Sequence, residues 1–199
     1  MNSRIGSQRN VAHHYNIGNA FYQLMLDAEH MQYSCAYWDD GVETLAGAQE
    51  AKLAHIAAKL ALAPGQEVLD LGCGSGILSI AAAKLGAETV VGLEIDSVAA
   101  QAAVSNVGTN NVAGTVRVMH GTLDQCDDLA GAYDLALANI SAKVLSELAD
   151  SLVAAVRPGG RIIASGVLTE KREAVEQRLR DAGAAVERTV IDGDWIALV

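Results

Sequence analysis

The most constraining stretch of the sequence is residues 67–76, which read Glu-Val-Leu-Asp-Leu-Gly-Cys-Gly-Ser-Gly and precede an apolar, alanine-rich run over residues 77–85. This pattern predicts a short buried strand, a glycine turn and the start of a helix. Open α/β sheets build ligand sites from this unit, beyond the carboxyl ends of their strands. Glycines let the backbone approach a ligand closely, and free N–H groups at a helix start favour negative charge. We therefore expect a ligand site at residues 70–76.

After Pro64 the sequence alternates between short apolar runs that suit buried strands and longer runs that suit helices. The expected strands are residues 68–71, 89–95, 115–120, 133–138, 161–167, 185–191 and 195–199, and the expected helices are residues 77–85, 97–107, 141–156 and 169–182. Such alternation gives a mainly parallel sheet, and Asp192-Gly193-Asp194 predicts a hairpin turn. Pro158-Gly159-Gly160 is expected to stop the helix over 141–156. The predicted fold is α/β, with a doubly wound, mainly parallel, seven-stranded Rossmann-like sheet that ends in an antiparallel hairpin.

The first 63 residues differ in character from the rest of the chain. Apolar residues recur at helical spacing over residues 16–26 and 45–62, and all but two of the aromatic side chains come before position 40. These aromatic residues form either a local core or the lining of a cavity over the glycine turn. We expect residues 1–63 to be an N-terminal helical lid and residues 64–199 to be the ligand-binding core, within one compact domain overall.

Charge and cysteine usage limit the possible partners. The net charge of −10 argues against nucleic acid, whose phosphates require a basic patch. No apolar run of about 18 residues is present to span a bilayer, and the first residues lack the apolar centre of a signal peptide. Cys35, Cys73 and Cys126 are odd in number and widely spaced, so they predict neither a disulfide framework nor a metal site. A reducing cytoplasm fits these features, and the sequence does not predict an oligomeric state.

The spacing of the glycines distinguishes two kinds of nucleotide site. A dinucleotide site has G-x-G-x-x-G, whereas here the third glycine comes one residue earlier and Ile77 stands where a dinucleotide site needs a small residue. The pattern Asp-x-Gly-x-Gly-x-Gly after a strand resembles the first motif of the class I S-adenosylmethionine-dependent methyltransferases. The resemblance implies S-adenosyl-L-methionine as the cofactor and the methyltransferase version of the doubly wound fold.

Glu94 closes the second expected strand and follows the glycine turn by about 20 positions. An acidic residue there can accept hydrogen bonds from both ribose hydroxyls, whereas the alternative role of a carboxylate at a helix start suits Asp96 better. Asp70 either orients the turn, accepts structural hydrogen bonds from it, or receives the ammonium group of the cofactor. The other expected cofactor contacts are Gly72, Cys73, Gly74 and Gly76 in the turn, Ile95 after the second strand, Thr122 and Leu123 near the adenine, and Asn139 near the methionine moiety.

Residues 13–60 resemble the cyclopropane fatty acid synthase family. The resemblance rests on His-His-Tyr-Asn-Ile-Gly-Asn at 13–19, Met-Gln-Tyr-Ser-Cys-Ala-Tyr-Trp at 31–38 and Ala-Gln-Glu-Ala-Lys-Leu at 48–53. It implies that this segment caps the cofactor pocket, with Tyr15, Tyr33 and Ser34 touching S-adenosylmethionine. It also implies that Cys35 helps to hold bicarbonate, the base in cyclopropanation. His14 beside Tyr15 is a candidate general base, with packing or capping as its alternative role.

Residues 65–199 resemble a different family, the catalytic domain of bacterial ribosomal-protein lysine methyltransferases. The segments that carry this resemblance are residues 69–80, 138–140, 157–160, 164–168 and 194–199. It implies a protein acceptor. The chain therefore looks like a hybrid of two families that agree on the cofactor and differ in the acceptor.

The departures from the cyclopropane synthase pattern bear on the acceptor. That family needs a glutamate after the fourth strand and a histidine near the end of the fifth, and residues 139–143 and 164–166 contain neither. Complete cyclopropanation is therefore not expected. The leading hypothesis is a methyltransferase that acts by in-line displacement on a small-molecule or acyl acceptor under the lid. The alternatives are a methyltransferase acting on a ribosomal or similar protein, and a non-catalytic S-adenosylmethionine-binding protein.

Overall fold

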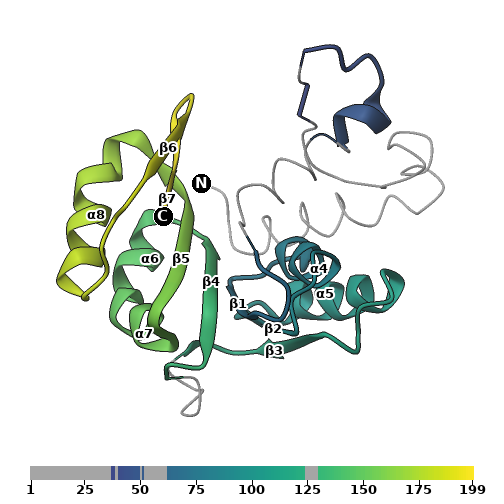
Figure 1. The fold of residues 1–199 in the computed structure, drawn as a ribbon, viewed down its shortest axis with the longest axis horizontal. Helices are drawn as coiled ribbons and strands as arrows, with labels where there is room; N and C mark the ends of the chain where they lie inside the picture. Colours follow the sequence, from purple (N-terminus) through teal and green to yellow (C-terminus); the bar gives the residue numbers. More distant parts are fainter. Residues whose placement is uncertain (1–36, 39, 50, 52–61, 124–129) are drawn as a thin grey trace, which may run out of the picture. The chain divides into compact units, whose positions relative to one another are not determined.

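The computed structural model describes residues 37–38, 40–49, 51, 62–123 and 130–199. The chain divides into two compact units, residues 1–59 and residues 60–199 (Figure 1). In the first unit, residues 45–49 are helical, and the Thr44 hydroxyl oxygen accepts a hydrogen bond of 3.1 Å from the Gly47 N–H. This helical stretch coincides with the start of the helix expected over residues 45–62.

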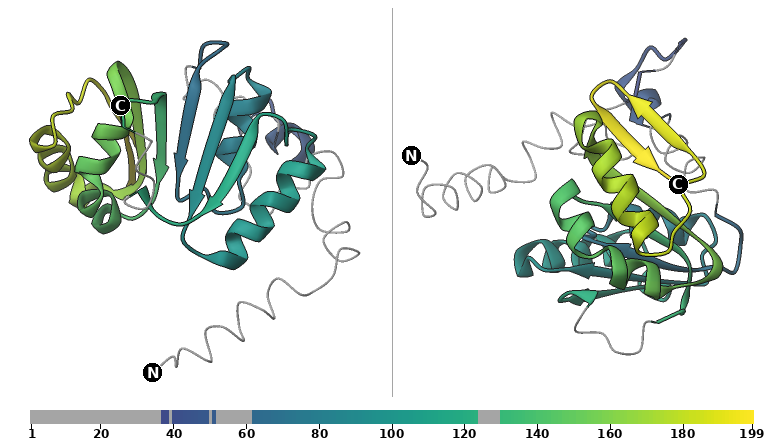
Figure 2. Two further views of the ribbon diagram at one scale, coloured as in Figure 1. Left: turned by 90° about the horizontal axis from the view of Figure 1, so that it is seen from below. Right: turned by 90° about the vertical axis from the view of Figure 1, so that its left-hand side faces the viewer.

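The second unit is built on a seven-stranded sheet in the order β3-β2-β1-β4-β5-β7-β6. Its strands are β1 (Glu67–Leu71), β2 (Thr89–Glu94), β3 (Val116–His120), β4 (Tyr133–Asn139), β5 (Val156–Leu168), β6 (Thr189–Asp192) and β7 (Trp195–Leu198). Strands β1 to β5 pair in parallel, whereas β7 is antiparallel to both β5 and β6. The β6–β7 hairpin forms one edge of the sheet (Figure 2). The predicted doubly wound sheet with its terminal hairpin is confirmed.

Two groups of helices cover the sheet. The helices are α4 (Ile77–Lys84), α5 (Ser97–Thr109), α6 (Ala142–Glu147), α7 (Ala149–Ala155) and α8 (Arg172–Asp181), and a short 3-10 turn, η2, spans Thr169–Lys171. Figure 1 shows α4 and α5 beside β1 to β3, and α6, α7 and α8 beside β4 and β5. Because parallel crossovers are right-handed and the strand order reverses between β1 and β4, the two groups pack on opposite faces. Sheets of this kind bind ligands at such a reversal, beyond the carboxyl ends of the strands, here β1 and β4.

The central strands are buried on both faces. Val68 and Leu69 of β1 are fully buried, as are the apolar side chains of β4 from Leu135 to Ala138. Continuous apolar strands of this kind belong in a parallel sheet that helices cover on both sides. The sheet therefore forms a rigid base for the turns at its carboxyl edge.

The structure corrects three of the expected element boundaries. The helix expected over 141–156 is two helices separated at Leu148, and α7 ends at Ala155. Strand β5 then begins at Val156 and includes residues 158–160, where its register with β4 shifts, and a proline is tolerated at such an irregularity. The strand expected over 185–191 begins only at Thr189. The N–H groups of the two preceding residues both donate to the Val199 carbonyl oxygen, which a regular ladder does not do.

Candidate functional site

The glycine turn joins the carboxyl end of β1 to α4. Gly72, Gly74 and Gly76 have φ values of +71°, +55° and +82°, a region that only glycine enters freely. The N–H groups of Gly72 and Cys73 both donate to the Leu93 carbonyl oxygen, at 2.8 and 3.0 Å. The turn is thereby fixed to the end of β2, the neighbouring strand.

The three glycines differ in the space beside them. A Cβ at Gly72 would lie 2.5 Å from Cγ2 of Ile140, and one at Gly76 would lie 3.3 Å from the Cβ of Ala103. A Cβ at Gly74 would meet no atom within 4 Å. Gly72 and Gly76 are therefore required for packing, whereas Gly74 faces the open space in which a ligand can approach the backbone.

Glu94 ties the glycine turn to the end of β2. Its Oε2 accepts a hydrogen bond of 2.8 Å from the Gly74 N–H, and its Oε1 accepts one of 2.9 Å from the Asp96 N–H. A carboxylate has about four acceptor positions, so each oxygen can accept a further hydroxyl. Asp96 is the N-cap of α5, where its Oδ1 accepts from the N–H groups of Val98 and Ala99. The helix-start role thus belongs to Asp96, and Glu94 is free for a diol.

Asp70 is a buried carboxylate beneath the turn. It is 1% exposed, its Oδ2 accepts a hydrogen bond of 2.6 Å from the Ser79 hydroxyl, and its Oδ1 has no hydrogen-bond partner among the described residues. Burial raises the pKa of Asp70 to about 6; the hydrogen bonds from Ser79 oppose this shift, and the charge of Glu94 adds to it. Burial disfavours the ionised form of Asp70, and a cation bound nearby would stabilise that form. The position therefore suits a site that receives a cation.

The pKa of Asp70 predicts a pH dependence of stability. Because the folded-state pKa of about 6 lies above the ordinary aspartate pKa of 3.8, ionisation destabilises the native state, by roughly 3 kcal/mol once the pH exceeds both values. The free energy of unfolding of the wild type, relative to that of Asp70→Asn, should therefore fall as the pH rises from about 4 to above 6. Urea unfolding of both proteins across this range measures the difference. A difference that does not vary with pH would contradict the assignment.

Cys73 packs beneath the turn as a small apolar group. It is buried, and burial raises the pKa of its thiol to about 12, which favours the uncharged thiol at neutral pH. Gly92 of β2 makes room for it, because a Cβ there would lie 3.1 Å from the Cys73 sulfur and 3.0 Å from the Ser79 hydroxyl. Sequence reasoning missed Ser79 and Gly92, although a glycine inside a strand signals close approach of other groups.

The residues expected near the adenine lie at and just after the ends of β2 and β3. Ile95 is 71% exposed, and its carbonyl oxygen lies 3.0 Å from Nε2 of His120. Thr122 is partly buried, and Leu123 lies in the hydrophobic core, so Leu123 can face a ligand only with its backbone. Asn139 ends β4 with an exposed side chain. Each cofactor role assigned to these residues stays a prediction.

Some of the expected site residues fall outside the described residues. These are His14, Tyr15, Tyr33, Ser34 and Cys35. In the part of the chain that the structure describes, no group of three or more histidine, cysteine, aspartate or glutamate side chains is placed to hold a metal ion. Within the same residues, no helix is long and apolar enough to cross a membrane.

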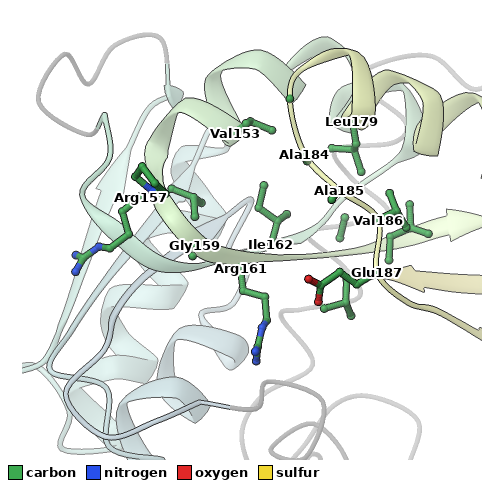
Figure 3. A pocket seen from close by; sticks show the side chains of 17 residues that line it. Val153, Arg157, Gly159, Arg161, Ile162, Leu179, Ala184, Ala185, Val186 and Glu187 are labelled. Carbon is green, nitrogen blue, oxygen red and sulfur yellow. The ribbon is translucent and has the colours of Figure 1, made fainter.

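A cavity of about 480 Å³ lies away from the glycine turn, on the amino-terminal half of β5. Figure 3 shows apolar side chains such as Ile162 and Leu179 lining it, with Arg161 and Glu187 beside them. No residue expected to hold the cofactor lines this cavity. It is therefore separate from the glycine turn and from Glu94.

Comparison with known proteins assigns the family. Residues 52–199 match the family model described as "Ribosomal protein L11 methyltransferase (PrmA)". The chain belongs to this family. A ribosomal protein L11 methyltransferase of an Exiguobacterium species is 45% identical over 135 residues, which is 68% of this chain and 43% of that protein. The chain spans less than half the length of the curated ribosomal protein L11 methyltransferases that it matches.

Solved structures agree with this assignment. A ribosomal protein L11 methylase from Lactobacillus delbrueckii subsp. bulgaricus matches with a TM-score of 0.66 and 32% identity, covering 76% of this chain and 77% of that chain. The cyclopropane synthase MmaA2 from Mycobacterium tuberculosis matches with a TM-score of 0.65 and 21% identity, covering 88% of this chain and 74% of that chain. At that identity the second likeness shows the shared class I methyltransferase fold alone.

Proposed function

We propose that this chain transfers the methyl group of S-adenosyl-L-methionine to a protein acceptor, ribosomal protein L11. The observation that carries the proposal is the glycine turn tied to Glu94, within a region that matches the L11 methyltransferase family from residue 52 to residue 199. A protein acceptor fits these matches better than the small-molecule or acyl acceptor first expected. A ribosomal acceptor also suits the reducing cytoplasm expected from the cysteines.

The site fits the cofactor in four places. Glu94 would accept the ribose hydroxyls, and the open side of Gly74 would admit the ligand against the backbone. The exposed Ile95 side chain would pack on the adenine, with Thr122 and Leu123 at its edge. The buried Asp70 carboxylate would place negative charge near the ammonium group of the cofactor. That ammonium group would in turn lower the cost of ionising Asp70. S-adenosylmethionine supplies an activated methyl group, and the chain must hold the acceptor amine in line with the methyl–sulfur bond.

Bicarbonate has no support as a second cofactor. Residues 139–143 and 164–166 lack the glutamate and the histidine that the cyclopropane synthase resemblance requires. Asn139 and Gly166 stand in these two segments instead, at the carboxyl ends of β4 and β5. The Asn139 amide at this place can form a hydrogen bond with an amine. It is less suited to a reaction in which bound bicarbonate removes a proton.

Calorimetry and methyl transfer test the proposal together. The purified chain should bind S-adenosylmethionine and its demethylated product, and it should transfer labelled methyl groups to ribosomal protein L11 in a time-dependent manner. An L11 sample whose amines have been chemically blocked serves as the control acceptor. Binding without transfer to L11 would contradict the protein acceptor. Absence of binding would contradict the cofactor assignment as well.

A further inference from the structure

Strand β5 carries an extra residue beside the end of β4. Ala164 pairs with Leu198 of β7 and Val167 pairs with Ile196, so three steps along β5 match two steps along β7. Gly166 lies within this bulge and has a φ of +79°. Bulges next to functional sites re-aim side chains, because the extra residue bends the strand locally.

The bulge lies directly against the peptide that ends β4. A Cβ at Gly166 would lie 2.8 Å from the Ile140 carbonyl oxygen and 2.9 Å from Oδ1 of Asn139. The Ile140 N–H also donates to the Ser165 carbonyl oxygen at 3.2 Å. Any side chain at position 166 must therefore displace this peptide or the Asn139 amide.

The side chain of Ile140 packs against the glycine turn. Gly72 leaves room for Cγ2 of Ile140, which would lie 2.5 Å from a Cβ at that position. Ile140 thus lies between the two, with its side chain against the glycine turn after β1 and its backbone against the bulge in β5. Ile140 cannot retreat from a side chain at position 166 without pressing on the turn that contains Gly74, whose N–H donates to Glu94.

The Asn139 side chain is placed to meet a ligand. It is exposed at the carboxyl end of β4, at the reversal of strand order, and no described residue forms a hydrogen bond with its amide. Because no hydrogen bond from a described residue fixes the Asn139 amide, its position depends on the groups packed around it. Gly166 is the neighbour whose lack of a side chain sets how closely the amide sits against β5.

We propose that Gly166 is a positioning residue, which holds the Asn139 amide in the place where it orients the acceptor amine for methyl transfer. This inference rests on the proposed function and assigns the orienting step to a bulge in β5. Catalysis is sensitive to such placement, because a displacement of about 1 Å can lower a rate 100-fold.

Gly166→Ala tests the proposal against a matched control. Gly159 lies on the same strand with a φ of +81°, and a Cβ there meets no atom within 4 Å, so Gly159→Ala introduces similar backbone strain without the contact. For Gly166→Ala we expect kcat with ribosomal protein L11 to fall at least 10-fold, with the KM for S-adenosylmethionine changed less than 3-fold. Gly159→Ala should retain the wild-type kcat.

A second readout separates this inference from the proposed function. In ¹⁵N spectra of the full chain, Gly166→Ala should shift the Asn139 side-chain amide and the Ile140 N–H, whereas Gly159→Ala should not. Unshifted signals would overturn the positioning role, whether or not the wild type turns over L11. Shifted signals with unchanged kcat would overturn its part in catalysis, and a wild type inactive on L11 would overturn the proposed function.

Asn139→Ala covers the case in which Gly166→Ala fails to fold. This variant removes the exposed amide and leaves the bulge intact. If it folds and retains the wild-type kcat, the proposal is wrong. If it lowers kcat at least 10-fold with a similar KM for the cofactor, the amide has the orienting role that Gly166 serves.

Discussion

Gly74→Val should lower the affinity for S-adenosylmethionine at least 100-fold while the protein stays folded. A Cβ at Gly74 meets no atom of the chain within 4 Å, so the new side chain would occupy the space that the ligand needs. The strain of a left-handed φ of +55° costs roughly 1–2 kcal/mol, which a domain with this core can tolerate. Calorimetric titration with the cofactor measures the affinity, and urea unfolding measures the free energy of unfolding.

Gly193→Val is the control for backbone strain. Gly193 lies in the β6–β7 hairpin turn with a φ of +54°, and a Cβ there also meets nothing within 4 Å. Both variants should lose similar stability, and only Gly74→Val should lose cofactor binding. Equal binding by Gly74→Val and the wild type would mean that the cofactor does not approach the turn at this residue.

The fold was predictable because its signals are local. Strands β1, β2 and β4 are mainly apolar, and glycine or proline marks most of the turns between elements. The break at Leu148 was not predictable, because the apolar periodicity of α6 and α7 reads as one continuous helix. The path of β5 through Pro158 depends on its shifted pairing with β4, a tertiary contact without a local signal.

The site was predictable only in part, because several of its contacts join segments that are distant in the sequence. Spacing alone selected Glu94, which the structure places against the turn. The packing of Ile140 against Gly72 and Gly166 joins segments about 70 and 26 residues apart in the chain, and only the folded sheet brings them together. The buried Asp70–Ser79 pair likewise needs α4 to pack on β1 before the two side chains meet.

The two family resemblances that make the chain look like a hybrid fall almost entirely in different compact units. The family model begins at residue 52, close to the division between residues 59 and 60, so it covers the second unit almost alone. The glycine turn, Glu94 and Asn139 all belong to that second unit. Cofactor binding should therefore follow the family of the second unit.

Glu94→Ala should weaken the binding of S-adenosylmethionine roughly 100-fold or more. It removes the carboxylate that we propose accepts both ribose hydroxyls, and hydrogen bonds to a charged group contribute about 1.5–3 kcal/mol each. It also leaves the N–H groups of Gly74 and Asp96 without their partner, which loosens the turn before the ligand arrives. Glu94→Gln keeps one acceptor oxygen and should lose about 10-fold in affinity, since it retains about half of these interactions.

Glu88→Ala is the control for the change in net charge. Glu88 is exposed and immediately precedes β2, at the end of the strand opposite Glu94. Its removal therefore changes the net charge by the same amount without touching the turn. Titration of each variant with S-adenosylmethionine and with its adenine base alone locates the lost contact. If the carboxylate binds the ribose, Glu94→Ala weakens the nucleoside-containing ligand and leaves adenine unchanged. Equal weakening of both ligands would show that Glu94 acts only by shaping the turn.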